Sequence, residues 1–316
     1  MHPDLRAQLE RIFGSIALVS PASWTCAGEV TEVQPEQLPA KLTAFLYRRC
    51  YIRWFSDPAP ENPGDDLTGA LREAHPGRPR RDMGWRVIEP LEDGWVIARK
   101  GGAARRFAPG RYLVLEGGLG TAKKDQALLV WPGRESLTIQ PEYYYAFGDT
   151  AGECDEGEDL LRFYWNVTAE GAPRLLRALV ERLNYFQTPF HCKLPRFRHS
   201  YPRRDAAVLY LNRRYYRIAA MIAAAVHAQL RDSLCDPTPL FTKRLAPGLA
   251  LAEDPHESFG MHRCAILAEA FLTAYRNGLT TPDDQVREFD RQFALRGLDL
   301  NRPYLNHGSR DEYDFS

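Results

Sequence analysis

The spacing of apolar residues changes along the chain, and these changes restrict the folds that its 316 residues can adopt. Residues 4–13 and 38–55 carry apolar side chains three and four positions apart, which is typical of amphipathic helices. Between residues 85 and 132 the pattern changes to short β-branched and aromatic runs separated by turn residues, which indicates strands. The sequence therefore predicts an α+β fold with a helical N-terminal portion and a central, mostly antiparallel sheet.

Beyond residue 161 strand and helix patterns alternate, so we expect a C-terminal region of strands and helices. Predicted strands cover residues 162–168, 189–195 and 205–211, and predicted helices cover residues 173–186, 213–230 and 261–275. Residues 239–255 are expected to be extended and loop-like. The acidic loop around Asp155 is the predicted boundary between an N-terminal region, residues 1–155, and the C-terminal region, residues 156–316. A single integrated domain is the alternative.

Charge and cysteine usage exclude several classes of protein. Lys plus Arg and Asp plus Glu both number 41, so we expect no nucleic-acid partner, because nucleic-acid-binding domains usually carry a basic excess. The six cysteines never occur at C-x-x-C spacing and predict neither a zinc site nor a disulfide framework. The N-terminus does not resemble a signal peptide, and no apolar run reaches about 18 residues. We therefore expect a cytoplasmic protein with no membrane partner.

The segment PHESFGMHRC, residues 255–264, combines a helix start with residues that bind anions. Ser258 is placed as an N-cap, and Gly260 then lies in the first turn, where backbone N–H groups lack partners within the helix. These amides and the positive end of the helix dipole favour an anion. His262 and Arg263 add a titratable donor and a planar fork that matches phosphate oxygens. An ordinary capped helix with both side chains on its surface is the alternative.

The predicted strand PFHCKLP places His191 and Lys193 on one face, because alternate residues of a strand point the same way. The two side chains could form an acid and base pair if the lysine is neutral. Burial near other cations lowers the pKa of a lysine. Three cations elsewhere in the sequence could be such neighbours: Arg203, Arg204 and Lys243. A solvated basic strand edge is the alternative.

Two further segments carry candidate binding residues. Asp205 begins an apolar strand directly after two arginines, so its carboxylate could orient an arginine or a histidine. A turn aspartate paired with a surface arginine is the alternative. Lys243 precedes a loop made rigid by Pro247, and fixed loops often carry binding residues, although a purely structural loop fits equally well. The sequence has no phosphate-loop, nucleophile-elbow, kinase catalytic-loop or H-E-x-x-H motif, and we expect no metal and no cofactor.

Several long segments, in the same order, resemble the HopA-type effector family, which was first named for type III secreted proteins of plant-pathogenic bacteria. The resemblance extends from Leu161 to Tyr275 and is poor over the N-terminal helices. The segments that carry it are RFYWNVTAEGAPRLLRALVERLN, PFHCKLP, RRDAAVLYL, PLFTKRLAPGLALAEDP and ESFGMHRC. Related domains accompany aminoglycoside-phosphotransferase-like kinases in gene clusters for class V lanthipeptides and thioamitides.

The resemblance implies a phosphoserine/phosphothreonine lyase that acts on a precursor peptide of ribosomal origin. The partner kinase phosphorylates Ser or Thr of the precursor, and the lyase eliminates phosphate to leave dehydroalanine or dehydrobutyrine. In that role Lys193 is the expected base, His262 the expected acid with His191 as the alternative acid, and Asp205 an orienting residue. The expected phosphate-binding residues are Arg263, Lys243, Arg203, Arg204, Ser258 and Gly260.

Two other functions fit the same residues. The chain could be a non-catalytic phosphopeptide-binding or scaffold partner of the kinase, because basic residues that grip phosphate serve both functions. It could also be a virulence effector that acts on a host phosphoprotein. A lysine with a strongly lowered pKa is expected of the catalytic site and not of the binding site. In each case the N-terminal region is a possible docking site for the peptide or a partner.

Overall fold

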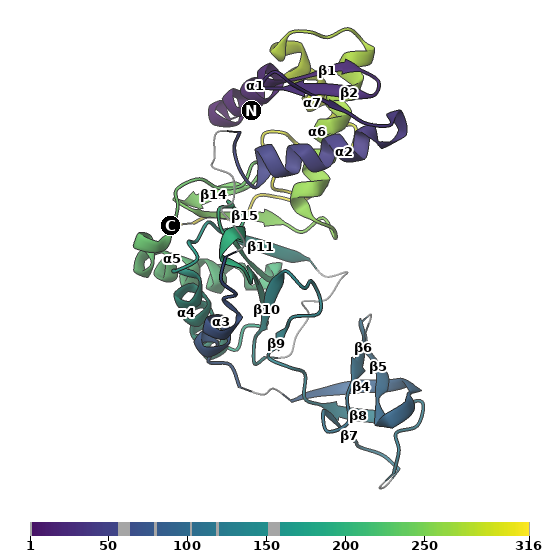
Figure 1. Cartoon of the computed structure of the whole chain (residues 1–316). Coiled ribbons are helices and arrows are strands. Elements are labelled where there is room, and N and C mark those ends of the chain that lie inside the picture. Colours follow the sequence, from purple (N-terminus) through teal and green to yellow (C-terminus); the bar gives the residue numbers. More distant parts are fainter. Residues whose placement is uncertain are drawn as a thin grey trace.

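The computed structural model describes residues 2–55, 64–78, 81–101, 103–117, 120–150 and 159–315. Within these residues the chain forms helices and three antiparallel sheets, which confirms the predicted α+β class. Figure 1 shows helices at both ends of the chain packed together, a large sheet in the middle and a smaller sheet to one side. The predicted boundary at Asp155 lies in residues 151–158, outside the described residues, and stays a prediction.

The largest sheet has seven strands in the order β14-β15-β11-β13-β12-β10-β9, and all of its pairs are antiparallel. Its strands are β9 (Glu135–Ser136), β10 (Tyr143–Phe147), β11 (Leu160–Trp165), β12 (His191–Pro195), β13 (Ala207–Asn212), β14 (Lys243–Ala246) and β15 (Leu249–Glu253). The interior strand β11 is buried along its whole length. Such a strand appears in sequence as a continuous apolar run, and this is why β11 and β13 could be predicted.

The structure changes one strand prediction. Residues 239–255 were expected to be loop-like, but most of this segment forms the hairpin of β14 and β15, with Gly248 at a φ of 70° in its turn. Only glycine adopts that backbone conformation without strain. All five residues of β15 are buried, so their side chains show no alternation that would identify a strand. The expectation of an extended backbone is correct, and the expectation of a loop is wrong.

Three helices lie side by side against the seven-stranded sheet (Figure 1). They are α3 (Thr68–Ala74), α4 (Ala172–Tyr185) and α5 (Tyr216–Gln229), with α4 in contact with the other two. The apolar face of α4 is fully covered, which agrees with the amphipathic pattern predicted for residues 173–186. Short helical turns connect the elements at η1 (Pro35–Gln37), η3 (Glu92–Gly94), η4 (Arg198–Ser200), η5 (Arg213–Tyr215) and η6 (Arg231–Ser233).

Both ends of the chain contribute to one layer of helices. The helix α6 (Phe259–Arg276) packs against α2 (Leu38–Leu46) and α7 (Pro282–Ala294), and α7 packs against α1 (Pro3–Ser15). The rings of Phe13 and Phe271, for example, lie 4.6 Å apart between centroids. A three-stranded sheet follows α1, with strands β1 (Ile16–Ser20), β2 (Ser23–Cys26) and β3 (Glu29–Glu32). Sequence analysis missed it, because its strands are short and β3 is exposed throughout.

The smaller five-stranded sheet has its own hydrophobic core. Its strands are β4 (Asp82–Pro90), β5 (Val96–Lys100), β6 (Ala103–Phe107), β7 (Tyr112–Val114) and β8 (Ala127–Val130), in the order β6-β5-β4-β8-β7. Its buried residues are Trp85, Val87, Val96, Ala98, Phe107, Ala122, Leu128 and Val130. None of these belongs to the cluster that unites the other sheets and helices. The strands predicted between residues 85 and 132 are therefore confirmed.

No helix in the described part of the chain is both long enough and apolar enough to cross a membrane.

The separation of the two cores predicts that a core mutation in the five-stranded sheet acts locally. Leu128→Ala leaves a cavity at a fully buried position, and it should lower the free energy of unfolding of this sheet by about 2–5 kcal/mol. Leu113→Ala is the matched control, since that side chain is 55% exposed. Hydrogen exchange with mass spectrometry should show faster exchange in β4–β8 and unchanged exchange in β11–β15. Equal acceleration in both sheets would contradict the separation.

Candidate functional site

Five of the predicted site residues line one narrow cavity beside the seven-stranded sheet. They are Lys193, Arg203, Asp205, Ser258 and Gly260. The cavity has a volume of about 40 Å³, and the other residues that line it are Tyr47, Tyr51, Tyr143, Arg162, Tyr164, Val208 and Tyr210. It is therefore built from strands β10 to β13, the start of α6 and the N-terminal segment that follows α2.

Lys193 lies on β12 with its amine over aromatic rings. Its Nζ atom is 3.8 Å from the centroid of the Tyr143 ring, and it makes no hydrogen bond or ion pair with any described residue. Burial lowers the pKa of Lys193 to about 8. The Asp205 carboxylate opposes this effect, while the guanidinium groups of Arg203 and Arg162 add to it. A substantial fraction of this amine is therefore neutral near pH 8.

Asp205 orients Arg203 beside the lysine. The Nε and Nη2 atoms of Arg203 donate to the two carboxylate oxygens of Asp205 at 2.6 and 3.0 Å. Its Nη1 donates to the Tyr143 hydroxyl at 2.8 Å, and its Nη2 also donates to the Tyr47 hydroxyl at 3.2 Å. Four of its five N–H groups therefore have protein acceptors. Arg203, a predicted neighbour of Lys193, and Asp205, predicted to orient an arginine or a histidine, both lie near the lysine, and most of the arginine's donors are occupied.

A second buried arginine, which sequence analysis missed, forms another wall of the cavity. Arg162 of β11 donates through Nε and Nη2 to the carboxylate of Asp254 at 3.1 and 2.8 Å, and Nη2 also donates to the Glu257 carbonyl at 2.6 Å. The available signal was a charged residue within an apolar strand, because a buried charge requires a partner. Among the described cavity residues, Lys193 is thus the cation without a carboxylate partner.

The start of α6 forms the opposite wall. Ser258 is the N-cap, as predicted, and its Oγ accepts a hydrogen bond from the Met261 amide at 3.4 Å. Gly260 is required by packing, because a Cβ at this position would lie 2.4 Å from Cε1 of Tyr51 and 2.7 Å from Cε2 of Tyr47. The first turn of α6, whose backbone N–H groups lack partners within the helix, therefore borders the cavity, and the two tyrosine rings pack against it.

The two N-terminal tyrosines belong to a π-helical turn, η2 (Tyr47–Tyr51), that continues α2. Their rings are stacked, with centroids 5.4 Å apart and an angle of 16° between planes. The predicted helix 38–55 covers these residues, but the sequence pattern did not indicate the π-helical geometry, and π-helical turns often occur at functional sites. Tyrosines are ordinary core residues in sequence, so this pair gave no signal before the fold was known.

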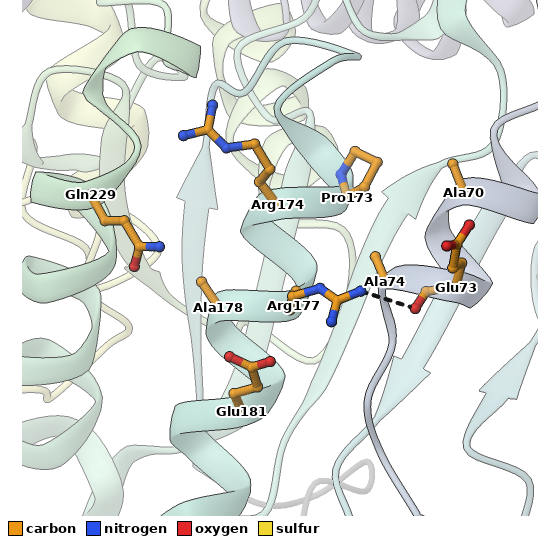
Figure 2. A pocket seen from close by; sticks show the side chains of 9 residues that line it. All are labelled: Ala70, Glu73, Ala74, Pro173, Arg174, Arg177, Ala178, Glu181 and Gln229. Carbon is orange, nitrogen blue, oxygen red and sulfur yellow. Dashed lines mark hydrogen bonds between the residues drawn. The ribbon is translucent and has the colours of Figure 1, made fainter.

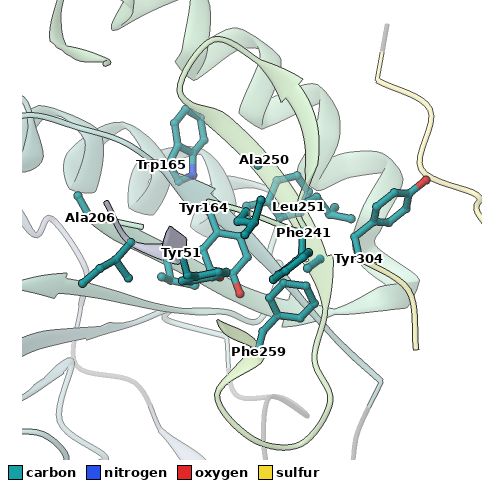
Figure 3. Packing of buried hydrophobic residues seen from close by; sticks show 14 of the residues in the cluster. Tyr51, Tyr164, Trp165, Ala206, Phe241, Ala250, Leu251, Phe259 and Tyr304 are labelled. Atoms are coloured by element: carbon teal, nitrogen blue, oxygen red, sulfur yellow. The ribbon is translucent and has the colours of Figure 1, made fainter. Parts of the chain in front are cut away.

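Two of the cavity tyrosines have buried hydroxyl groups without hydrogen-bond partners. Among the described residues, neither hydroxyl has a partner that meets strict hydrogen-bond geometry, although the two hydroxyls lie close enough to each other, and that of Tyr164 close enough to Arg162, for a weak hydrogen-bonding interaction that shifts the tyrosine pKa values. Burial raises the pKa of both, so both stay protonated. Figure 3 shows Tyr51, Tyr164 and Phe259 together in the buried cluster.

His262 and Arg263 do not line the cavity. His262 Nδ1 lies 2.6 Å from Nη1 of Arg263, and burial, with Arg263 and Arg296, lowers the pKa of His262 to about 4. Such an imidazole is neutral at pH 7, so its position and charge do not support the predicted role of acid. Arg263 is fully buried and donates to the carbonyls of Pro303 and Leu305 at 2.8 Å each. It anchors the C-terminal segment and does not face the predicted phosphate site.

The three remaining predicted residues also lie outside the cavity lining. Lys243 on the edge strand β14 donates to both carboxylate oxygens of Asp311 at 2.8 Å. The Arg204 guanidinium carbon lies 5.7 Å from the centroid of the Trp54 ring, and Arg204 is not among the residues that line the cavity. His191 shares a face of β12 with Lys193, as predicted, but it stacks on the Tyr210 ring with centroids 4.3 Å apart.

A second hollow between α3 and α4 contains none of the predicted residues. It has a volume of about 330 Å³ and is lined by Ala70, Glu73, Ala74, Pro173, Arg174, Arg177, Ala178, Glu181 and Gln229 (Figure 2). Arg177 spans it and donates to the Glu73 carbonyl at 3.3 Å. Acidic and basic side chains alternate here, so it offers no concentrated charge for a ligand. In the described part of the chain, no group of three or more His, Cys, Asp or Glu residues could hold a metal ion.

Comparisons with known proteins agree with the resemblance found in the sequence. The sequence model of the HopA1 effector protein family matches residues 135–305. The structure is similar to the effector protein from Pseudomonas syringae pv. tomato strain DC3000, with a TM-score of 0.50, 16% sequence identity and coverage of 86% of this chain and 95% of that chain. The effector protein from Pseudomonas syringae pv. syringae strain 61 matches with a TM-score of 0.40, 15% identity and coverage of 52% and 63%. A search of curated proteins found no match.

The close approach of Gly260 to two tyrosine rings predicts a strong effect of a single methyl group. Gly260→Ala should displace the Tyr47 and Tyr51 rings and lower the free energy of unfolding by about 1–3 kcal/mol. Gly14→Ala is the matched control, because it also lies in a helix but has open space around it, and it should stabilise by about 0.5–1 kcal/mol. Urea unfolding followed by circular dichroism measures both. An unaffected Gly260→Ala variant would contradict the packing described here.

Proposed function

Because this chain belongs to the HopA1 effector protein family, we propose that it is a phosphoserine/phosphothreonine lyase whose base is Lys193. Its substrate is a precursor peptide phosphorylated by an aminoglycoside-phosphotransferase-like kinase in the cytoplasm, and its product contains dehydroalanine or dehydrobutyrine. The observation that supports this most is the state of Lys193: a buried amine with a pKa of about 8 and no carboxylate partner among the described residues. A lysine that only grips phosphate has no need of a lowered pKa.

The elimination begins with removal of the weakly acidic Cα proton of the phosphorylated residue. A general base is most effective when its pKa lies near the working pH. At pH 7 about one-tenth of an amine with a pKa of about 8 is neutral, far more than for an ordinary lysine. The ammonium formed by the proton transfer then lies over the Tyr143 ring, where a cation is stabilised.

The electron pair of the Cα–H bond forms the Cα–Cβ double bond, and the Cβ–O bond breaks. The singly protonated phosphate group of the ester leaves as the hydrogen phosphate dianion. Lys193 gains the Cα proton, so charge and protons balance. At pH 7 the bound ester dianion and the Lys193 ammonium reach the reactive state by exchanging one proton. The N-terminus of α6 and the remaining donor of Arg203 stabilise the charge on the departing phosphate.

This scheme needs no histidine. His262 and His191 were the expected acids, but neither lines the cavity, and a leaving group that carries its own proton requires no acid from the protein. The small volume of the cavity restricts what can enter it to the phosphorylated side chain. The peptide backbone then lies outside the cavity. Entry of the phosphorylated side chain requires displacement of side chains that line the cavity, such as the flexible lysine. Asp205 keeps the predicted orienting role, since it fixes Arg203.

A second candidate function is favoured by the description of the family and of its structural neighbours as effectors. In this case the same elimination acts on a host phosphoprotein. A third function, phosphopeptide binding without catalysis, uses the same cavity but requires no neutral lysine. The first two functions differ in the substrate that loses phosphate. In the third function, no substrate loses phosphate.

Incubation with a synthetic phosphoserine precursor peptide, without kinase, ATP or metal, tests the proposed chemistry. Mass spectrometry should show loss of phosphoric acid with the wild-type protein. Lys193→Ala should slow this loss by roughly 10²- to 10⁴-fold and should still bind the peptide, because only the base is removed. Lys243→Ala is the matched control and should react at the normal rate, since Lys243 is paired with Asp311 outside the cavity. A normal rate for Lys193→Ala rejects this base, and no reaction on a bound peptide favours the binding function.

The pKa of Lys193 can be measured directly in protein labelled with ¹³C at the lysine ε carbons. The resonance that disappears in Lys193→Arg should titrate with a midpoint near pH 8, and the amine is neutral above that pH. Asp205→Asn should move the midpoint lower, because the carboxylate of Asp205 favours the charged lysine. A midpoint above 10 in the wild-type protein would contradict the proposed base.

A further inference from the structure

Tyr51 and Tyr164 line the same cavity, and the hydroxyl group of each lacks a partner that meets strict hydrogen-bond geometry among the described residues. The side chains are 1% and 3% exposed, so bulk water does not replace the missing partners. Buried hydroxyl groups in proteins almost always have a partner, and each exception requires an explanation. Two exceptions in one small cavity indicate a ligand with at least two acceptor atoms.

The surrounding packing holds these hydroxyls beside the start of α6. The rings of Tyr51 and Tyr164 each lie 6.3 Å from the ring of Phe259, the first residue of that helix, measured between centroids. The Tyr47 ring stacks on the Tyr51 ring and packs against Gly260. The two tyrosines and the first turn of an 18-residue helix therefore line a common cavity, and such a helix start favours an anion.

The other donors of the cavity cannot fill this role alone. Arg203 has four of its five N–H groups directed to Asp205, Tyr143 and Tyr47. Arg162 is directed to Asp254 and to the Glu257 carbonyl. Arg203 therefore keeps one N–H group and Arg162 keeps those of its Nη1 atom, and these are few donors for a phosphate group. Neutral hydroxyl groups, which stay protonated in this buried setting, supply further donors.

We propose that the Tyr51 and Tyr164 hydroxyls donate hydrogen bonds to two oxygens of a tetrahedral oxyanion, the phosphate group of the substrate, at the N-terminus of α6. This inference rests on the proposed function for the identity of the anion. Tyr51 lies outside the family match at residues 135–305, whereas Tyr164 lies inside it. The N-terminal segment thus completes the phosphate site of the family core, in addition to any role in docking.

Inorganic phosphate and a phosphoserine peptide are the probes for this site, used with the full chain. Calorimetric titration should show that Tyr51→Phe and Tyr164→Phe each weaken phosphate binding by about tenfold, and that the double variant weakens it further. In the absence of phosphate, the melting temperature of each variant should stay the same or rise, because a buried hydroxyl without a partner has been removed. A role limited to structure would instead lower it.

Tyr201→Phe is the matched control, since Tyr201 is also buried but donates its hydroxyl hydrogen to the Pro195 carbonyl at 2.9 Å. This variant should lose thermal stability and keep its affinity for phosphate. The inference is overturned if the double variant binds phosphate as tightly as the wild type, or if the wild type binds none. If phosphate binding depends on both hydroxyls but no peptide is dehydrated, the lyase proposal fails and the inference stands. If the double variant dehydrates the peptide at the normal rate, the inference fails and the lyase proposal stands.

Discussion

The buried ion pair between Arg162 and Asp254 fixes the region on which the rest of the site depends. Arg162 lies in an interior strand of the large sheet, where a charge without a partner would be strongly destabilising. Its fork binds the Asp254 carboxylate and the Glu257 carbonyl, both in the few residues between β15 and α6. The start of α6 is thereby attached to the sheet beside the cavity that Lys193 also lines. This pair acts together with the hydrogen bond from the Asp254 amide to the Leu160 carbonyl, at 2.9 Å, to fix the helix start relative to the lysine.

The charges around Lys193 meet two opposite requirements: the site has to attract an anion, and its lysine has to stay partly neutral. Each arginine has its own carboxylate, so burying four charged groups leaves no unpaired charge apart from the lysine. Burial together with the nearby guanidinium groups still favours the neutral amine, and Asp205 limits the effect. A site of this kind can accept an anion and keep a base near neutrality. A cluster of unpaired cations would bind phosphate more simply, but it would also be costly to bury.

The cavity combines segments that are far apart in sequence. The π-helical turn after α2 brings Tyr47 and Tyr51 onto Gly260, and glycine is the residue that allows the rings this close. The helices α1, α2, α6 and α7 pack as one layer, so the N-terminal segment is held by the C-terminal part of the chain. The family match covers residues 135–305 and leaves this turn outside it. The N-terminal segment therefore shapes the site even though its sequence does not carry the resemblance.

The sequence by itself determined the α+β class, the strands of the family core, the N-cap at Ser258 and the shared face of His191 and Lys193, because these follow from local periodicity and capping. It could not determine where each charged side chain points. His262 and Arg263 follow Ser258 on the same helix, yet successive helical residues turn by about 100°, and Arg263 is directed to the C-terminal segment. The cavity tyrosines resembled ordinary core residues until packing between distant segments left two of their hydroxyls without partners. Tertiary structure decides such contacts, because they depend on the pairing of segments that no local pattern encodes.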